Sequence, residues 1–232
     1  MNLLGSLFHS SIGKKFLMAS TGLVLVGFVA GHLLGNLQIF LPPAKINAYA
    51  HFLESLGAGL WLIRLFLLAC VTLHIWLAFK LTAENRVARP QDYEVEHVNR
   101  ATLASRVMLR SGVVVLVFLV YHLLHFTFRL QHPEWSEPTF RLADNLFVRD
   151  VHTMMVAGFS NGWISSFYLL GTGLLAYHLH HGLVSMFQTL GLKNERWTTG
   201  LERAALAGCW LYFLGNAAIP LSILAGVVKL HA

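Results

Sequence analysis

The chain has 232 residues, of which 56% are hydrophobic and only 12% are charged. Soluble domains carry about twice that charged fraction, and the apolar residues here are gathered in long runs. The formal net charge of +6 comes from lysine and arginine between those runs, which indicates membrane flanks rather than nucleic-acid binding. Both cysteines lie inside apolar runs, which argues against a secreted disulfide framework.

Five apolar runs are long enough to form membrane helices. Each has about 20 mostly apolar residues, which suffices to cross a hydrocarbon core of roughly 30 Å. The first run is not a cleavable signal peptide, because it is long and no small-residue cleavage pattern follows it. The sequence therefore predicts an all-α integral membrane bundle in one domain, residues 1–232, with no apparent internal repeat. The expected helices are about 16–38, 57–79, 107–129, 161–187 and 204–229.

The segments between the runs predict the orientation. If the N-terminus is inside, the inner segments carry eleven lysines and arginines and the outer segments carry five. This asymmetry follows the positive-inside rule and predicts a cytoplasmic N-terminus. The outer segment 41–57 has a Pro-Pro break and then an amphipathic stretch. The long outer segment 131–162 has enough apolar residues to pack against the membrane surface.

Histidines occur at two depths in four of the expected helices. The first and third helices carry histidine in their outer parts, and the second and fourth carry it in their inner parts. The fourth helix contains the unusual stretch "LLAYHLHHGL" at 174–183. The outer histidines are His32, His122 and His125, and the inner ones are His74, His178, His180 and His181.

Two matched levels of histidine are what two stacked bis-histidine haems require. Imidazole is a good ligand for iron, and helix bundles build cofactor sites from side chains on facing helices. At 1.5 Å per residue the two levels would be roughly 20 Å apart. Any single histidine could instead bond only a neighbouring carbonyl or serine. Glycines near the histidines could admit a flat macrocycle or serve helix packing alone.

Spacing leaves some choices among neighbouring histidines open. His125 follows His122 by three residues, about 60° round a helix, so either could face the cofactor. His180 is about 160° from the face of His178. His181 is near that face but closer to the cytoplasmic end, so His178 is the preferred inner ligand.

Four stretches together resemble the five-helix, di-haem cytochrome b subunit of succinate dehydrogenase and fumarate reductase, and the resemblance covers nearly the whole chain. They are "MASTGLVLVGFVAGHLLGNLQIF", "HFLESLGAGLWLIRLFLLACVTLHIWLAFKLTAENR", "RSGVVVLVFLVYHLLHFTF" and "GFSNGWISSFYLLGTGLLAYHLHHGLVSMFQTLG". The resemblance implies that His32 and His122 ligate the outer, distal haem b. It implies His74 and His178 for the inner, proximal haem b.

The resemblance also implies partners and a location. A flavoprotein subunit would act on succinate or fumarate, and an iron–sulfur subunit would relay electrons to this chain. The chain itself has no dinucleotide fingerprint and no cysteine cluster of the iron–sulfur type. It would be the quinone-reactive membrane anchor in a bacterial cytoplasmic membrane, and family grounds favour menaquinone.

Charged residues near the expected helix ends are candidates for quinone and propionate contacts. Glu54 matches an acidic position in the family and could transfer quinone protons, or it could be an exposed carboxylate. Arg64 could bind a haem propionate, pair with Glu54, or extend to the membrane surface. Arg106, Arg110 and His181 are further propionate candidates, although the positive-inside charge bias also explains both arginines.

Two other functions compete with this interpretation. One is a cytochrome b anchor of another quinone-linked enzyme, such as a hydrogenase or formate dehydrogenase; one ligand histidine on each of four successive helices argues against it. The other is a transporter with a histidine proton relay. A transporter would have broken helices and a polar midplane, whereas the midplane residues here are mainly Leu, Val, Phe and Gly.

Overall fold

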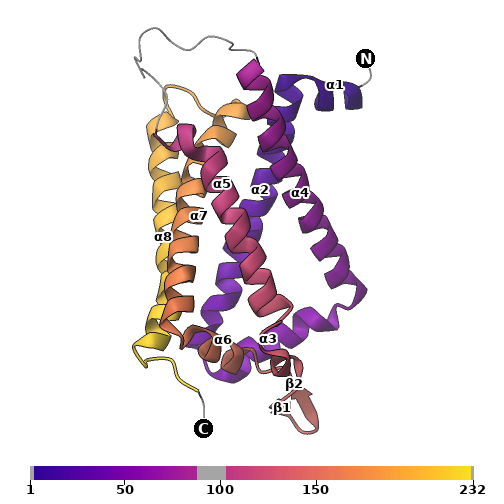
Figure 1. Cartoon of the computed structure of the whole chain (residues 1–232), viewed down its shortest axis with the longest axis vertical. Helices are drawn as coiled ribbons and strands as arrows, with labels where there is room; N and C mark the ends of the chain where they lie inside the picture. Colours follow the sequence, from indigo (N-terminus) through magenta and orange to yellow (C-terminus); the bar gives the residue numbers. More distant parts are fainter. Residues whose placement is uncertain (1–2, 88–102, 231–232) are drawn as a thin grey trace. The chain divides into compact units, whose positions relative to one another are not determined.

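A computed structural model describes residues 3–87 and 103–230, with side chains given for all of these except 3, 4, 6 and 103–107. The described chain is predominantly helical, which confirms the all-α class (Figure 1). The α-helices are α1 (Leu3–His9), α2 (Ser11–Asn36), α3 (Pro43–Ser55), α4 (Ala58–Val87), α5 (Leu103–His122), α6 (Val151–Phe159), α7 (Gly162–Thr189) and α8 (Thr198–Leu224). The short elements are η1 (Leu37–Phe40), η2 (Leu123–Thr127), η3 (Pro133–Ser136), β1 (Phe140–Ala143) and β2 (Leu146–Val148).

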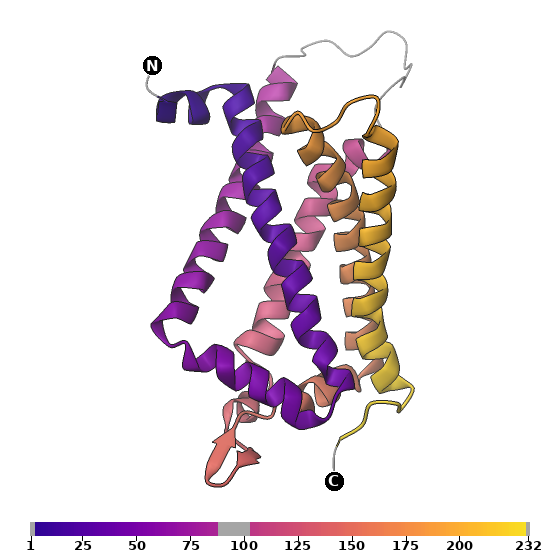
Figure 2. The same ribbon diagram turned by 180° about the vertical axis from the view of Figure 1, so that it is seen from behind.

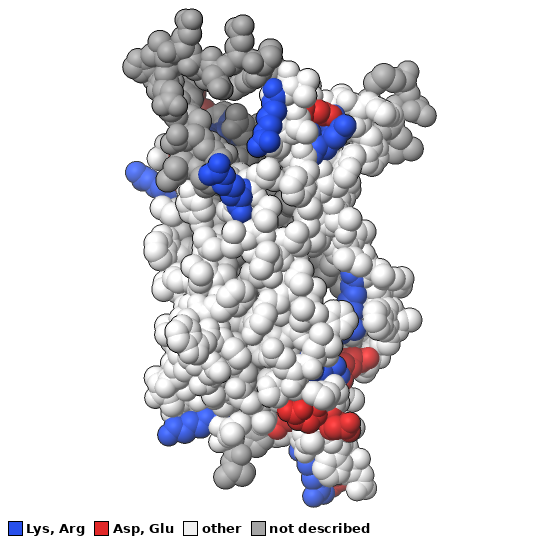
Figure 3. All heavy atoms as spheres, in the orientation of Figure 1, with Lys and Arg blue, Asp and Glu red and all other residues white. Residues whose placement is uncertain are grey.

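Four helical segments within the described residues are long and apolar enough to cross a membrane. The fifth expected span, 161–187, corresponds to α7, which has 28 residues and contains no Asp, Glu, Lys or Arg. It is not one of these four segments, and it contains three histidines together with glycine, serine and tyrosine. Charged side chains are sparse on the face that Figure 3 presents, with wide uncharged areas between them. The four segments are Ser11–Phe40, Ala58–Val87, Met108–Thr127 and Thr198–Leu224.

Two of the helices begin or end at residues other than those expected from the apolar runs. α4 continues through polar residues to Val87, beyond the expected end at 79. α8 begins at Thr198, before the expected 204, directly after a turn in which Asn194 accepts hydrogen bonds from the backbone N–H groups of Arg196 and Trp197. It ends at Leu224, and Gly226 then adopts φ +69°, a conformation that favours glycine after a helix.

The chain forms two compact units. The first unit comprises Met1–Phe28, Leu65–Val113 and Tyr177–Cys209. In it, the ammonium group of Lys14 near the start of α2 binds both carboxylate oxygens of Glu84 near the end of α4. Lys14 is only 3% exposed. An ammonium that is so deeply buried needs such a partner, so this pair ties the two helices together.

The second unit comprises Val29–Arg64, Val114–Ala176 and Trp210–Ala232. Its core is rich in aromatic residues and includes Phe118, Phe159 and Tyr168. Figure 2 shows α3 running between the end of α2 and the start of α4. β1 and β2 form an antiparallel hairpin in which Phe140 pairs with Val148. The loop 131–162 that was expected to pack on the membrane surface thus contains this hairpin and α6.

A buried amide joins α3 to the start of α6 in this unit. Asn47 of α3 is 0% exposed. Its Nδ2 donates to Oδ1 of Asp150 at 3.1 Å, and its Oδ1 accepts from the backbone N–H of His152 at 3.0 Å. Asp150 also caps α6 by accepting from the backbone N–H of Thr153. The side chain of Asn47 therefore sets the position of α3 against α6.

Candidate functional site

The second unit brings two of the expected ligands together. The ring centroids of His32 and His122 are 5.7 Å apart and the ring planes are nearly perpendicular, at 82°. His32 lies near the end of α2 and is exposed, and His122 is the last residue of α5 and is half-buried. A first-row metal lies about 2 Å from an imidazole nitrogen, which sets the centroids of two axial rings about 6 Å apart. The observed pair fits that requirement.

The first unit contains the other two expected ligands, His74 of α4 and His178 of α7. Each ring has a hydroxyl group beside its Nδ1. Thr21 Oγ1 of α2 is 3.1 Å from Nδ1 of His74. Ser111 Oγ of α5 is 3.2 Å from Nδ1 of His178.

The histidines at these sites are candidate metal ligands. Among the described residues no group of three or more His, Cys, Asp or Glu side chains is placed to hold a metal ion. A haem supplies the equatorial nitrogens itself, so the protein needs to provide only axial ligands. A pair of imidazoles is a donor set that a haem could use.

The structure distinguishes His122 from His125, which helical spacing alone does not. His125 is only 3% exposed and packs against Phe126 and Trp135, with ring centroids 4.1 and 5.8 Å away. Its Nδ1 is 3.0 Å from the hydroxyl of Tyr168. Its Nε2 is buried without a hydrogen-bond partner in the described part of the chain. His122 is the more accessible of the two rings, and it is the one that lies beside His32.

The helix changes its geometry directly after His122. Residues Leu123–Thr127 form a π-helical turn, in which the N–H of Phe128 donates to the carbonyl of Leu123 at 2.7 Å. Such wide turns occur often at functional sites. The mostly apolar stretch "VYHLLHFTF" gives no sequence signal for this turn.

Tyr168 of α7 is a site residue that the sequence analysis did not identify. Its hydroxyl contacts His125 and also lies 3.5 Å from Nδ1 of His122. Tyr168 is 5% exposed and belongs to the aromatic core around Phe118. A tyrosine on an aromatic helix face predicts packing, and nothing in its spacing distinguishes it from Tyr121.

The acidic candidate lies in an ion pair, but with a different arginine from the one considered. Glu54, at the end of α3, binds Arg149 at 2.9 Å. Arg64 is exposed and lies over the ring of Trp61, at 5.1 Å from its centroid. The pairing of Glu54 with Arg64 that the sequence left open is therefore replaced by the pair with Arg149.

A positive cluster surrounds Glu54. Burial lowers the pKa of Arg129; Arg149 lowers it further, Glu54 raises it and Arg64 lowers it. Arg129, Arg149 and Arg64 thus form a positive cluster near Glu54, and Arg149 is the one with an ion pair to it. Arg149 also has a buried Nε that lacks a hydrogen-bond partner among the described residues.

The remaining propionate candidates lie in the first unit and are less distinctive. Arg110 is exposed on α5. The side chain of Arg106 lies outside the described part of the structure. Nε2 of His181 is 3.2 Å from the hydroxyl of Ser185, one turn along α7. This imidazole therefore has a hydrogen-bond partner on its own helix.

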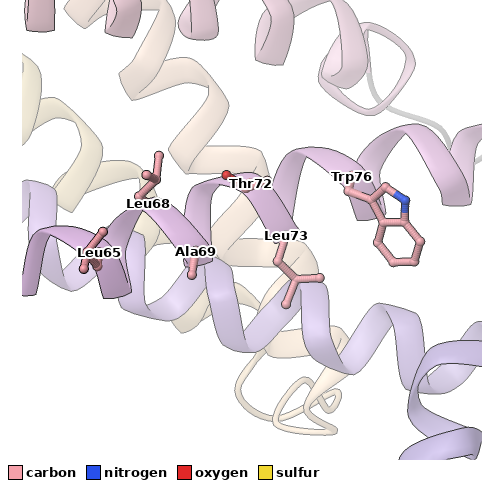
Figure 4. Close-up of a pocket in the computed structure, with 6 residues that line it drawn as sticks. All are labelled: Leu65, Leu68, Ala69, Thr72, Leu73 and Trp76. Carbon is pink, nitrogen blue, oxygen red and sulfur yellow. The ribbon is translucent and has the colours of Figure 1, made fainter. Parts of the chain in front are cut away.

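An apolar groove follows one face of α4 (Figure 4). By helical periodicity, His74 lies about half a turn round α4 from the middle of this face. The groove therefore faces away from the histidine pair. Its residues are Leu65, Leu68, Ala69, Thr72, Leu73 and Trp76.

Comparison with known proteins adds no relative: no family model matches the chain, and neither the curated proteins nor the solved structures include a match.

Proposed function

We propose that this chain is the membrane-anchor cytochrome b subunit of a succinate:quinone oxidoreductase. It would carry electrons between an iron–sulfur subunit and a membrane quinone with the help of two b haems. The observation that carries the proposal is the ring pair formed by His32 of α2 and His122 of α5, with centroids 5.7 Å apart. His74 of α4 and His178 of α7 support it, because each has a hydroxyl group beside its Nδ1.

The residues of each pair have defined tasks. His32 and His122 would be the axial ligands of the distal haem, and His74 and His178 those of the proximal haem. Each haem, when bound, supplies a one-electron carrier. The protein would contribute the imidazoles as ligands, and the identity and surroundings of such ligands help to set the potential.

The topology of the proposal has five spans, with α7 as the fifth. α7 carries no Asp, Glu, Lys or Arg. Two of its three histidines have a hydroxyl partner: His178 with Ser111, and His181 with Ser185. Such partners reduce the cost of placing an imidazole in a membrane. The charge asymmetry of the connecting segments supports a cytoplasmic N-terminus.

The quinone would react near Glu54. Quinone reduction consumes protons, and a carboxylate is a suitable group to transfer them. The ion pair with Arg149 supports this role, because it holds the carboxylate in one place beside a positive cluster. In this proposal the quinone is menaquinone, and the partners are a flavoprotein subunit and an iron–sulfur subunit in a bacterial cytoplasmic membrane.

Haem content tests the proposal. The full chain is purified in detergent, and haem per polypeptide is measured from a reduced-minus-oxidised spectrum. We expect two b-type haems per chain. One haem would mean that one histidine pair has another task. A folded chain without haem would overturn the proposal. The control for this outcome is the same chain purified after growth with added haem precursor.

A further inference from the structure

A hydroxyl residue followed by glycine lies beside each inner histidine. On α2 the pair is Thr21–Gly22, and on α5 it is Ser111–Gly112. A Cβ atom on Gly22 would lie 3.5 Å from Cε1 of His74, and one on Gly112 would lie 3.4 Å from Cε1 of His178. The two rings therefore meet their neighbouring helices in the same way, with Nδ1 at the hydroxyl and Cε1 over the glycine.

The hydrogen bonds of Thr21 define the direction of its contact with His74. The hydroxyl lies 2.9 Å from the carbonyl oxygen of Leu17 and 3.1 Å from that of Met18. A carbonyl only accepts, and a hydroxyl has one hydrogen to donate. With that hydrogen on a carbonyl, Thr21 Oγ1 accepts from Nδ1–H of His74.

Ser111 repeats this arrangement at the other ring. Its hydroxyl donates to the carbonyl oxygen of Met108 at 2.9 Å. Its lone pairs are then free to accept from Nδ1–H of His178, which is 3.2 Å away. In a neutral imidazole with a protonated Nδ1, Nε2 carries the lone pair that binds metal.

We propose that Thr21 and Ser111 are positioning residues for the proximal haem. Each fixes a protonated Nδ1 and thereby presents the bare Nε2 of His74 or His178 as the iron ligand. The inference rests on the proposed function and deepens it. A hydrogen bond from Nδ1–H makes the ligand more basic and tunes the metal, so the two hydroxyls lower the potential of one haem from both sides.

The same pattern extends to the outer ligands. His32 follows Thr21 by eleven residues, and His122 follows Ser111 by eleven residues. Eleven residues are close to three helical turns. α2 and α5 thus share a short repeat, a hydroxyl residue and glycine followed at this spacing by histidine. Each helix ligates the distal haem with its histidine and supports the proximal haem with its hydroxyl.

Potentiometric titration of the two haems in membranes that contain the full chain tests the inference. The variants are Thr21→Val and Ser111→Ala, which remove the hydroxyl groups at little change in volume. Thr172→Val and Ser222→Ala are matched controls, because these hydroxyls donate to their own helix at 2.8 Å in both cases and have no histidine neighbour among their described hydrogen bonds. Thr21→Ser is the rescue variant.

We expect Thr21→Val and Ser111→Ala each to raise the midpoint potential of the same haem and to weaken its retention by about 10-fold. The other haem and both controls should keep their potentials, and Thr21→Ser should restore the native value. Unchanged potentials, or equal shifts in the controls, would overturn the inference while the proposed function stands. A wild-type chain without haem would overturn both.

Discussion

The hydroxyl of Tyr168 lies 3.0 Å from Nδ1 of His125, inside a buried aromatic cluster. The same hydroxyl is within 3.5 Å of Nδ1 of His122. A phenol can donate one hydrogen bond and accept another. If His122 ligates iron through Nε2, its Nδ1–H donates to Tyr168, and Tyr168 donates to His125. Tyr168 would then connect the ligand to the enclosed histidine.

Tyr168→Phe should therefore affect the distal haem. The loss of the hydroxyl removes the acceptor for Nδ1–H of His122 and leaves a buried Nδ1 on His125 without its partner. We expect a shifted potential for one haem and a loss of about 1–3 kcal/mol in stability. Redox titration and thermal unfolding measure the two effects. Tyr121→Phe is the control, and an equal shift there would assign the effect to aromatic packing.

Single replacement of a distal ligand should remove one haem only. In His32→Ala or His122→Ala we expect one b haem per chain, with the proximal haem retained, because His74 and His178 form a separate pair. The pyridine haemochrome spectrum gives the haem content. His132→Ala, at a half-exposed histidine that binds Glu134, should keep both haems. Loss of both haems in a folded His32→Ala chain would contradict the pairing.

Glu54→Gln should separate quinone chemistry from haem binding. The amide keeps the shape of the side chain but loses the ability to take up and release a proton at neutral pH. We expect two haems, stability within about 1 kcal/mol of wild type because the ion pair with Arg149 is partly exposed, and slower quinone turnover. The assay is quinol oxidation by the assembled complex. Turnover equal to that of wild type would contradict a proton role for this carboxylate.

Asn47→Ala should destabilise the second unit. It removes the acceptor of the buried backbone N–H of His152 and the donor to Asp150. We expect a loss of about 1–3 kcal/mol, measured by thermal unfolding in detergent. Asn216→Ala is a matched control, because Asn216 donates only to the carbonyl of Tyr212 in its own helix among its described hydrogen bonds. A similar loss in both variants would rule out a special role for the buried amide.

Much of the fold can be predicted from apolar run length. Every expected span has a corresponding helix, because a run of that length satisfies its backbone hydrogen bonds within itself. The ends were less predictable. α4 continues through a polar stretch to Val87, where Glu84 binds Lys14 far away in the sequence, and hydropathy does not report such a partner.

The candidate site was predictable only in part. Histidine depth and the resemblance together led to His32, His74, His122 and His178. The structure places His32 beside His122 and gives His74 and His178 a hydroxyl neighbour each. The hydroxyl partners Thr21 and Ser111 were missed because serine and threonine are common in helices. A sequence signal could have identified them. In both helices a threonine or serine is followed directly by glycine, and a histidine comes eleven residues after the threonine or serine. The ion pair of Glu54 with Arg149 depends on the fold of a long loop and has no local signature.

The π-helical turn η2 predicts what the deletion of one residue after His122 would do to the structure. A π-helical turn corresponds to one residue inserted into an α-helix. A deletion of Leu123 or Leu124 would convert it to regular helix and rotate His125 by about 100° relative to His122. His122 would keep its place, but the contact of His125 with Tyr168 would be lost. Relatives that lack this extra residue should therefore also lack a histidine at the position of His125.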